Sequence, residues 1–128
     1  MSVAIKELPE LKVFVRDVVY MPNLDAPEDR PHPFVYYISI KNESQGPLRI
    51  RGRKWVVTDL EGNTTVVEGE GVVSQQPNIE PEQEFSYNSY HVIGCDSFAE
   101  GAFFAEQPDG QVVFTRIPRF EMKVPQWA

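Results

Sequence analysis

The sequence predicts an all-β domain, an antiparallel β-sandwich of about seven strands. Three observations carry this prediction. β-Branched and aromatic residues recur in short runs, Gly, Pro, Asn and Asp mark the turns between those runs, and eleven prolines suit edges and turns better than helices. The runs follow one another at a spacing of roughly 8–15 residues, which is typical of a sandwich.

The expected strands cover most of the chain. The most regular is 84–92, where Phe85, Tyr87 and Ser89 alternate with Ser86, Asn88 and Tyr90. Turn signals at 60–63 and 108–110 separate neighbouring strands, and the polar, proline-rich stretch 21–33 is expected to be a long connection. The other expected strands are 11–20, 34–42, 48–59, 64–73, 98–107 and 111–124.

The strand 48–59 contains a change of phase. Leu48 and Ile50 share one parity and Trp55 the other, so both can face the core only if the strand shifts by one residue between them. Gly52 lies in that interval, where a β-bulge supplies the shift. The bulge is expected to place Arg49, Arg51 and Lys54 on the outer face, with Arg53 depending on its position.

Length and charge limit the possible functions. The 128 residues form one domain, with its core expected within 11–125, and the net charge of −7 opposes general affinity for nucleic acid or an anionic membrane. The single cysteine, Cys95, cannot form an internal disulfide, and the N-terminus has no signal-peptide layout. No apolar run approaches the ~20 residues that span a bilayer. We therefore expect a cytoplasmic protein without cofactor or metal.

Several segments together resemble the ApaG family, also called the DUF525 domain. GRKWVVTDLEGNTTVVEGEGVVSQQPNIEPEQEFSYNS is similar to its central signature, and FTRIPRFEMKVP is similar to its C-terminal ending. The resemblance covers residues 11–125. It implies a fibronectin type III-like (immunoglobulin-like) β-sandwich.

For function the resemblance implies less. Bacterial members of the family have no established biochemical activity, their genes often neighbour one for a diadenosine-tetraphosphate hydrolase, and the family has been linked to cobalt and magnesium resistance. In eukaryotes the domain is carried by an F-box protein and by a DNA-polymerase-delta-interacting protein, where it resembles a binding module. This chain departs from the family pattern at Ser74, at Tyr90 and at 81–83.

The stretch EGEGVVSQQP contains G-x-G-x-x-S, with Gly69, Gly71 and Ser74 in the place of a phosphate-binding glycine motif. Such glycines bind phosphate when they close a turn between a parallel strand and a helix. The residues after Gly71 make a poor helix, and no βαβ unit surrounds them. A bend in a strand is therefore the preferred interpretation.

The basic run Arg49, Arg51, Arg53 and Lys54 is the better candidate for binding an anion, because alternate residues of a strand share a face. The alternative is a solvated outer face, or pairing with Glu68 and Glu70 across a hairpin. The sequence favours this alternative.

Catalytic and metal-binding patterns are weak. His91 and Cys95 lie four residues apart without a nucleophile elbow, so an incidental pair is preferred over a nucleophile and its base. Two histidines and one cysteine cannot form a closed zinc site, and the acidic run 25–29 lacks the spacing of a calcium loop.

Aromatic residues are the candidates for a binding surface. Trp55 is expected in the core, whereas Tyr36 with Tyr37, and Phe103 with Phe104, are adjacent pairs of which one member must point outward. We therefore expect a non-enzymatic protein–protein interaction module with an unidentified protein partner. The alternative is a phosphate- or nucleotide-binding protein or a factor in cobalt and magnesium homeostasis.

A homodimer is also expected, joined through strand edges or outer aromatics, with Phe103 or Phe104 as the central contact. Pro118 should mark an edge or a bulge in the last strand.

Overall fold

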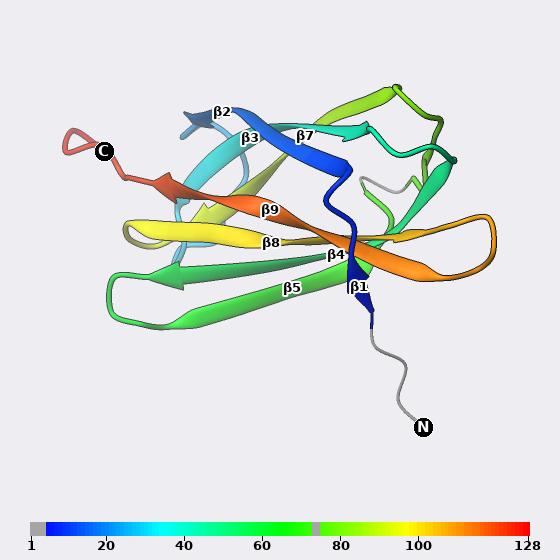
Figure 1. Cartoon of the computed structure of the whole chain (residues 1–128). Coiled ribbons are helices and arrows are strands. Elements are labelled where there is room, and N and C mark those ends of the chain that lie inside the picture. The colour runs from blue at the N-terminus through cyan, green and yellow to red at the C-terminus, as the bar shows by residue number, and fades with distance from the viewer. Residues whose placement is uncertain (1–4, 73–74) are drawn as a thin grey trace.

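The computed structural model describes residues 5–72 and 75–128, which form two packed β-sheets (Figure 1). Within these residues there is no helix, and hence no helix long and apolar enough to cross a membrane. The strands in the described part of the chain are β1 (Lys6–Glu7), β2 (Leu11–Tyr20), β3 (His32–Asn42), β4 (Leu48–Asp59), β5 (Thr64–Glu70), β6 (Asn78–Ile79), β7 (Glu84–Ile93), β8 (Ser97–Glu106) and β9 (Val112–Met122).

The all-β prediction is confirmed. Seven of these strands have seven residues or more, and β1 and β6, with two residues each, were not expected from the sequence. The predicted loop 21–33 is shorter, because His32 and Pro33 already pair with β7. Of the expected strand 64–73, β5 takes up residues 64–70, and Val73 lies outside the described residues.

The two sheets differ in size. The larger sheet has the order β1-β9-β8-β4-β5, with β6 beside the start of β4, and the smaller sheet has the order β2-β3-β7. All pairs are antiparallel except β1 with β9, which is parallel. Leaving out the short β1 and β6, four strands therefore face three.

The predicted bulge in β4 is present. The register between β4 and β8 shifts between Ile50 and Gly52. As a result Leu48, Ile50 and Trp55 are all buried, with at most 1% of each residue exposed. The register of β9 shifts opposite Glu100, between Ile117 and Phe120, so the expected irregularity at Pro118 is also confirmed.

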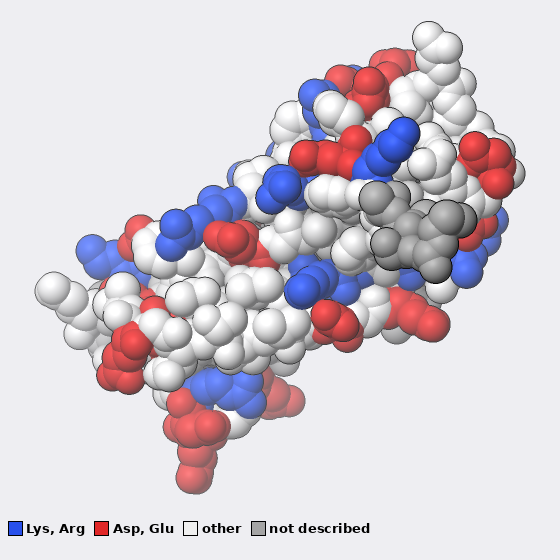
Figure 2. Space-filling view, turned by 60° about the horizontal axis from the view of Figure 1, so that its bottom comes forward, with Lys and Arg blue, Asp and Glu red and all other residues white. Residues whose placement is uncertain are grey.

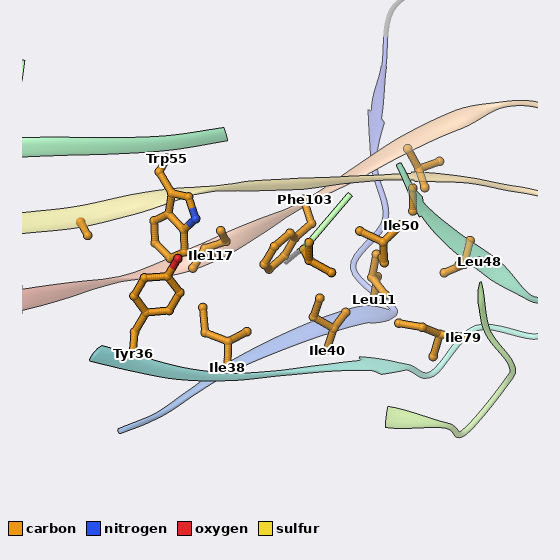
Figure 3. Packing of buried hydrophobic residues seen from close by; sticks show 14 of the residues in the cluster. Leu11, Tyr36, Ile38, Ile40, Leu48, Ile50, Trp55, Ile79, Phe103 and Ile117 are labelled. Atoms are coloured by element: carbon orange, nitrogen blue, oxygen red, sulfur yellow. The ribbon is translucent and has the colours of Figure 1, made fainter. Parts of the chain in front are cut away.

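Side chains from both sheets meet in one hydrophobic core (Figure 3). Trp55 from the larger sheet packs against Tyr36 from the smaller sheet, with ring centroids 4.8 Å apart. The expectation that Trp55 is a core residue is therefore confirmed.

Of the two aromatic pairs, the outer members are Tyr37 and Phe104, and both are only partly exposed. Tyr36 is 4% exposed and Phe103 is fully buried. The expectation that Phe103 contributes to a partner surface is therefore wrong, and Tyr36 points inward, away from the outer surface on which an aromatic contact was expected. Alternation along β8 places Phe103 on the same inner face as Ala105, where it contacts Tyr87 of the opposite sheet.

This difference predicts unequal stability effects at adjacent positions. Phe103→Ala should lower the free energy of unfolding by about 3–5 kcal/mol, because it leaves a cavity between the sheets. Phe104→Ala should cost no more than about 1.5 kcal/mol, because the side chain is already partly hydrated. Urea denaturation of the two variants measures both values, and equal losses would contradict the assignment of inner and outer faces.

Candidate functional site

A cleft of about 410 Å³ lies between the end of the β4–β5 hairpin and the edge of β7. Its walls are the inner faces of β4 and β5 on one side and residues 89–93 of β7 on the other. Tyr36 and Trp55 form part of its lining at the core, and Asp29 and Arg30 of the long connection lie at one end. The volume lies within the ~300–1,000 Å³ of ligand pockets.

The cleft exists because, within residues 5–72 and 75–128, no strand of the smaller sheet lies over β5. Every residue from Thr64 to Glu68 is exposed, on both faces of the strand. Val66 on the outer face is 52% exposed, and Val67 on the cleft side is 40% exposed. The larger sheet thus extends past the smaller one and leaves apolar surface uncovered.

Aromatic rings separate the cleft from the core. The His91 ring lies 4.7 Å from that of Trp55 and 4.8 Å from that of Tyr36, measured between centroids. Burial lowers the pKa of His91 to about 4, so the imidazole is neutral at pH 7. Burial also raises the pKa of Tyr36 and Tyr87.

Three polar atoms of the aromatic side chains in this region are buried and have no hydrogen-bond partner within the described residues. They are Trp55 Nε1, Tyr87 Oη and His91 Nε2. Such atoms are uncommon in native proteins and costly. The region around Tyr36 is therefore packed by shape and aromatic contact more than by hydrogen bonding.

Arg53 points to the cleft side of β4 and crosses the inner face of β5. Its Nη1 donates to the carbonyl oxygens of Glu70 and Gly71, both at 3.1 Å. A Cβ on Gly69 would lie 2.8 Å from Nη1 and 3.0 Å from Cζ. A side chain at residue 69 would therefore displace the guanidinium, which is the flexible end of Arg53, from this position.

Gly71 has a different role. Its φ of +62° lies in the left-handed region, and an added Cβ would collide with the carbonyl of Gln75. Its N–H donates to Arg51 O at 2.8 Å, and the N–H of Val72 donates to Gln75 O at 2.7 Å. Gly71 thus bends the chain directly after β5, as the sequence predicted, whereas Gly69 lies within the strand, paired with Arg53, and Ser74 lies outside the described residues.

The predicted anion-binding residues do not form one cluster. Arg49, Arg51 and Lys54 are exposed on the outer face, whereas Arg53 points to the opposite face. Lys54 Nζ lies 3.9 Å from a carboxylate oxygen of Glu68, and Arg51 Nε lies 3.8 Å from one of Glu106. Figure 2, which brings the β5 side of the molecule forward, shows basic and acidic side chains next to one another.

His91 and Cys95 both line the cleft, but His91 Nε2 is buried and Cys95 is exposed. Within residues 5–72 and 75–128, no three His, Cys, Asp or Glu side chains are grouped so that they could hold a metal ion. The cleft therefore offers apolar contact, the guanidinium of Arg53 and the backbone of a strand edge, with the charged side chains of Asp29, Arg30 and Asp59 also in its lining.

Comparison with known proteins identifies the family. The family described as ApaG domain, DUF525, matches residues 22–107. The chain belongs to the ApaG family. Proteins named ApaG from Enterobacter sp. (strain 638) and Salmonella newport are each 34% identical to it over 108 residues, which is 84% of this chain and 86% of theirs. The ApaG resemblance of the sequence is confirmed.

Solved structures give the same fold. A putative ApaA protein from Bordetella pertussis has a TM-score of 0.76 and 26% identity, covering 96% of this chain and 99% of that one. A structural-genomics target has a TM-score of 0.82 and 28% identity, covering 93% and 90%. The ApaG match runs from 22 to 107, so it contains all the segments that line the cleft.

Sequence reasoning missed the most exposed apolar residues of the cleft region, Val66 and Val67. Their adjacency was the available signal, because one of two neighbouring valines in a strand must point away from the core. That neither is buried depends on what lies over β5, which local sequence does not specify.

The fit between Gly69 and Arg53 predicts a coupled effect. Gly69→Ala should lower the free energy of unfolding by about 1 kcal/mol at most, because the methyl group displaces the guanidinium, the flexible end of a partly exposed side chain, from its two carbonyls. In an Arg53→Ala background the same change should cost clearly less. Gly46→Ala is the control, because nothing lies within 4 Å of its added Cβ. Additive losses in the double variant would refute this role of Gly69.

His91 predicts a pH dependence of stability. Its pKa is about 4 in the folded protein and 6.5 ordinarily, so between these values the unfolded state binds a proton that the folded state does not. The His91 contribution is complete above pH 6.5 and falls, by at most about 3 kcal/mol, as the pH drops to 4. Urea denaturation from pH 4 to 7 should show a weaker dependence in His91→Gln; identical slopes would show that His91 is not responsible.

Proposed function

We propose that this protein is a non-enzymatic binding module that holds a partner protein in the cleft between β5 and β7. The observation that carries the proposal is the uncovered inner face of β5. Val67 on this face is 40% exposed beside a preformed cleft, and covering it with a partner removes apolar surface from water.

The residues of the cleft support binding more than catalysis. His91 has its pKa lowered by burial and no hydrogen bond to the Cys95 thiol among the described contacts, so the two do not form an activated nucleophile. The side chains of Val57, Val67 and Thr65 supply a surface of mixed apolar and hydroxyl character. Such a surface suits recognition of a polypeptide.

The competing function, binding of phosphate or a nucleotide, has less support. A phosphate-binding glycine segment presents unpaired N–H groups to the anion. Here the N–H groups of Gly71 and Val72 donate within the chain, and the carbonyls of Glu70 and Gly71 face Arg53. Arg49, Arg51 and Lys54 on the outer face are what favours the anion function.

Two neighbouring valines provide a matched test of the proposal. Val67→Asp should abolish capture of the partner from a lysate of the native cells, because it places a charge on the cleft side of β5. Val66→Asp, on the outer face of the same strand, should leave capture unchanged. Both positions are exposed, so both variants should remain folded, which circular dichroism checks.

Affinity purification with quantitative mass spectrometry measures capture by the unchanged protein and by each of the two variants. A set of partners that Val67→Asp loses and Val66→Asp keeps supports the proposal. Partners retained by Val67→Asp, or lost equally by both variants, would place the binding surface elsewhere.

A further inference from the structure

The free edge of β7 opens into the cleft. In the described part of the chain β7 pairs with β3 alone, so its other edge is unpaired, and residues 89–93 along that edge line the cleft. Alternate residues of such an edge direct their N–H and C=O groups away from the sheet. A strand partner can therefore bond to β7 from within the cleft.

We propose that the partner enters as an extended segment that pairs with β7 beneath β5 and presents an acidic side chain to Arg53. This inference rests on the proposed function and specifies its chemistry. A strand added to β7 would lie about 4.8 Å from it, and sheets pack about 10 Å apart, so the segment would be the missing fourth strand of the smaller sheet. It would cover the inner face of β5.

The edge of β7 lacks the usual protection against pairing. From Glu84 to Ile93 it contains no proline, lysine or arginine, and the register with β3 is continuous over all ten residues. By contrast, β2 at the opposite edge carries Lys12, Arg16 and Asp17 and has a register shift. The smaller sheet is thus open to addition on its β7 side.

The cleft also limits the length of the segment. At the far end of the cleft the long connection approaches the turn after β7. A Cβ built on Gly94 would lie only 2.8 Å from the carbonyl oxygen of Asp29. Tyr90 Oη donates to Asp25 O at 3.2 Å. The open edge therefore extends over residues 89–93, enough for about five residues at ~3.3 Å each.

Arg53 supplies the charge that selects the segment. It is only partly exposed, and within the described residues no carboxylate lies within ion-pair distance of it, although Arg51 and Lys54 of the same strand each have one. An acidic side chain on the cleft side of Gly69 would lie close enough to this guanidinium to form an ion pair. Asp29 and Asp59 also line the cleft, so the acidic side chain is expected beside Arg53 and away from these two carboxylates. Acidic residues elsewhere on the surface oppose it only weakly, because charges beyond about 8 Å are screened at physiological salt.

The residues of β5 that line the cleft near Arg53 predict the second residue of the partner segment. Val67 lies two residues from Gly69 along β5 and faces the same side, toward the cleft. Side chains two apart on the added strand also share a side. The expected segment therefore has an acidic residue and, two residues away, an apolar one.

Selection of a phage-displayed library of random twelve-residue peptides on the full chain tests this inference. Enriched peptides should share an acidic and an apolar residue two positions apart, and calorimetry should show at least tenfold weaker binding when the acidic residue is changed to its amide. Arg53→Gln should weaken binding to the same extent, with no further loss when both changes are combined. Arg51→Gln, on the outer face, is the matched control and should bind normally.

Backbone pairing has its own readout, which needs no change to the protein. N-methylation of alternate residues of an enriched peptide should abolish binding in one register and spare it in the other, because only one set of N–H groups faces β7. If the peptide still binds with either set of alternate residues N-methylated, strand pairing with β7 is ruled out. If the enriched peptides contain no acidic residue, the role of Arg53 is ruled out.

The outcomes separate this inference from the proposed function. If no peptide is enriched but Val67→Asp still loses its cellular partner, the partner docks as a folded surface and only the present inference fails. If free glutamate or succinate binds as tightly as the peptides and competes with them, the cleft is a small-carboxylate site and the inference is likewise overturned.

Discussion

The one-residue register shift between Ile50 and Gly52 determines what every later side chain of β4 faces. Without it, Trp55 would project from the outer face and Lys54 would enter the core, because side chains alternate with a period of two. With it, Trp55 packs against Tyr36 across the two sheets, and Arg53 is directed to the inner side. Both the core and the wall of the cleft depend on this irregularity.

Arg53 then couples β4 to the segment that follows β5. Its guanidinium bonds the carbonyls of Glu70 and Gly71, and in this position it occupies the space that a side chain of residue 69 would take. The glycine-rich stretch is therefore fitted to a cation of its own chain. Its carbonyl oxygens point toward positive charge, whereas a phosphate-binding loop directs N–H groups toward negative charge.

The two edges of the sandwich differ in how they are protected. The β9 side is covered in part by β1 and interrupted by the bulge beside Pro118, and Thr115 Oγ1 donates to Leu11 O where β2 approaches β9. In the described part of the chain the opposite side has no covering strand and its edge strand β5 has no bulge, and both faces of β5 meet solvent. Native edges are ordinarily protected, so this asymmetry is the reason for proposing recognition on the β5–β7 side of the molecule.

The sequence by itself determined the seven long strands, the bulge near Gly52, the irregularity at Pro118 and the burial of Trp55, because each follows from local alternation and from backbone limits of single residues. It did not determine that Phe103 rather than Phe104 is buried, that Arg53 faces inward, or that β5 lacks a strand over it. Those outcomes depend on which distant strands pair and how many strands each sheet holds. Period-two patterning describes two faces of a strand, but only the packing of the other sheet decides which face is covered.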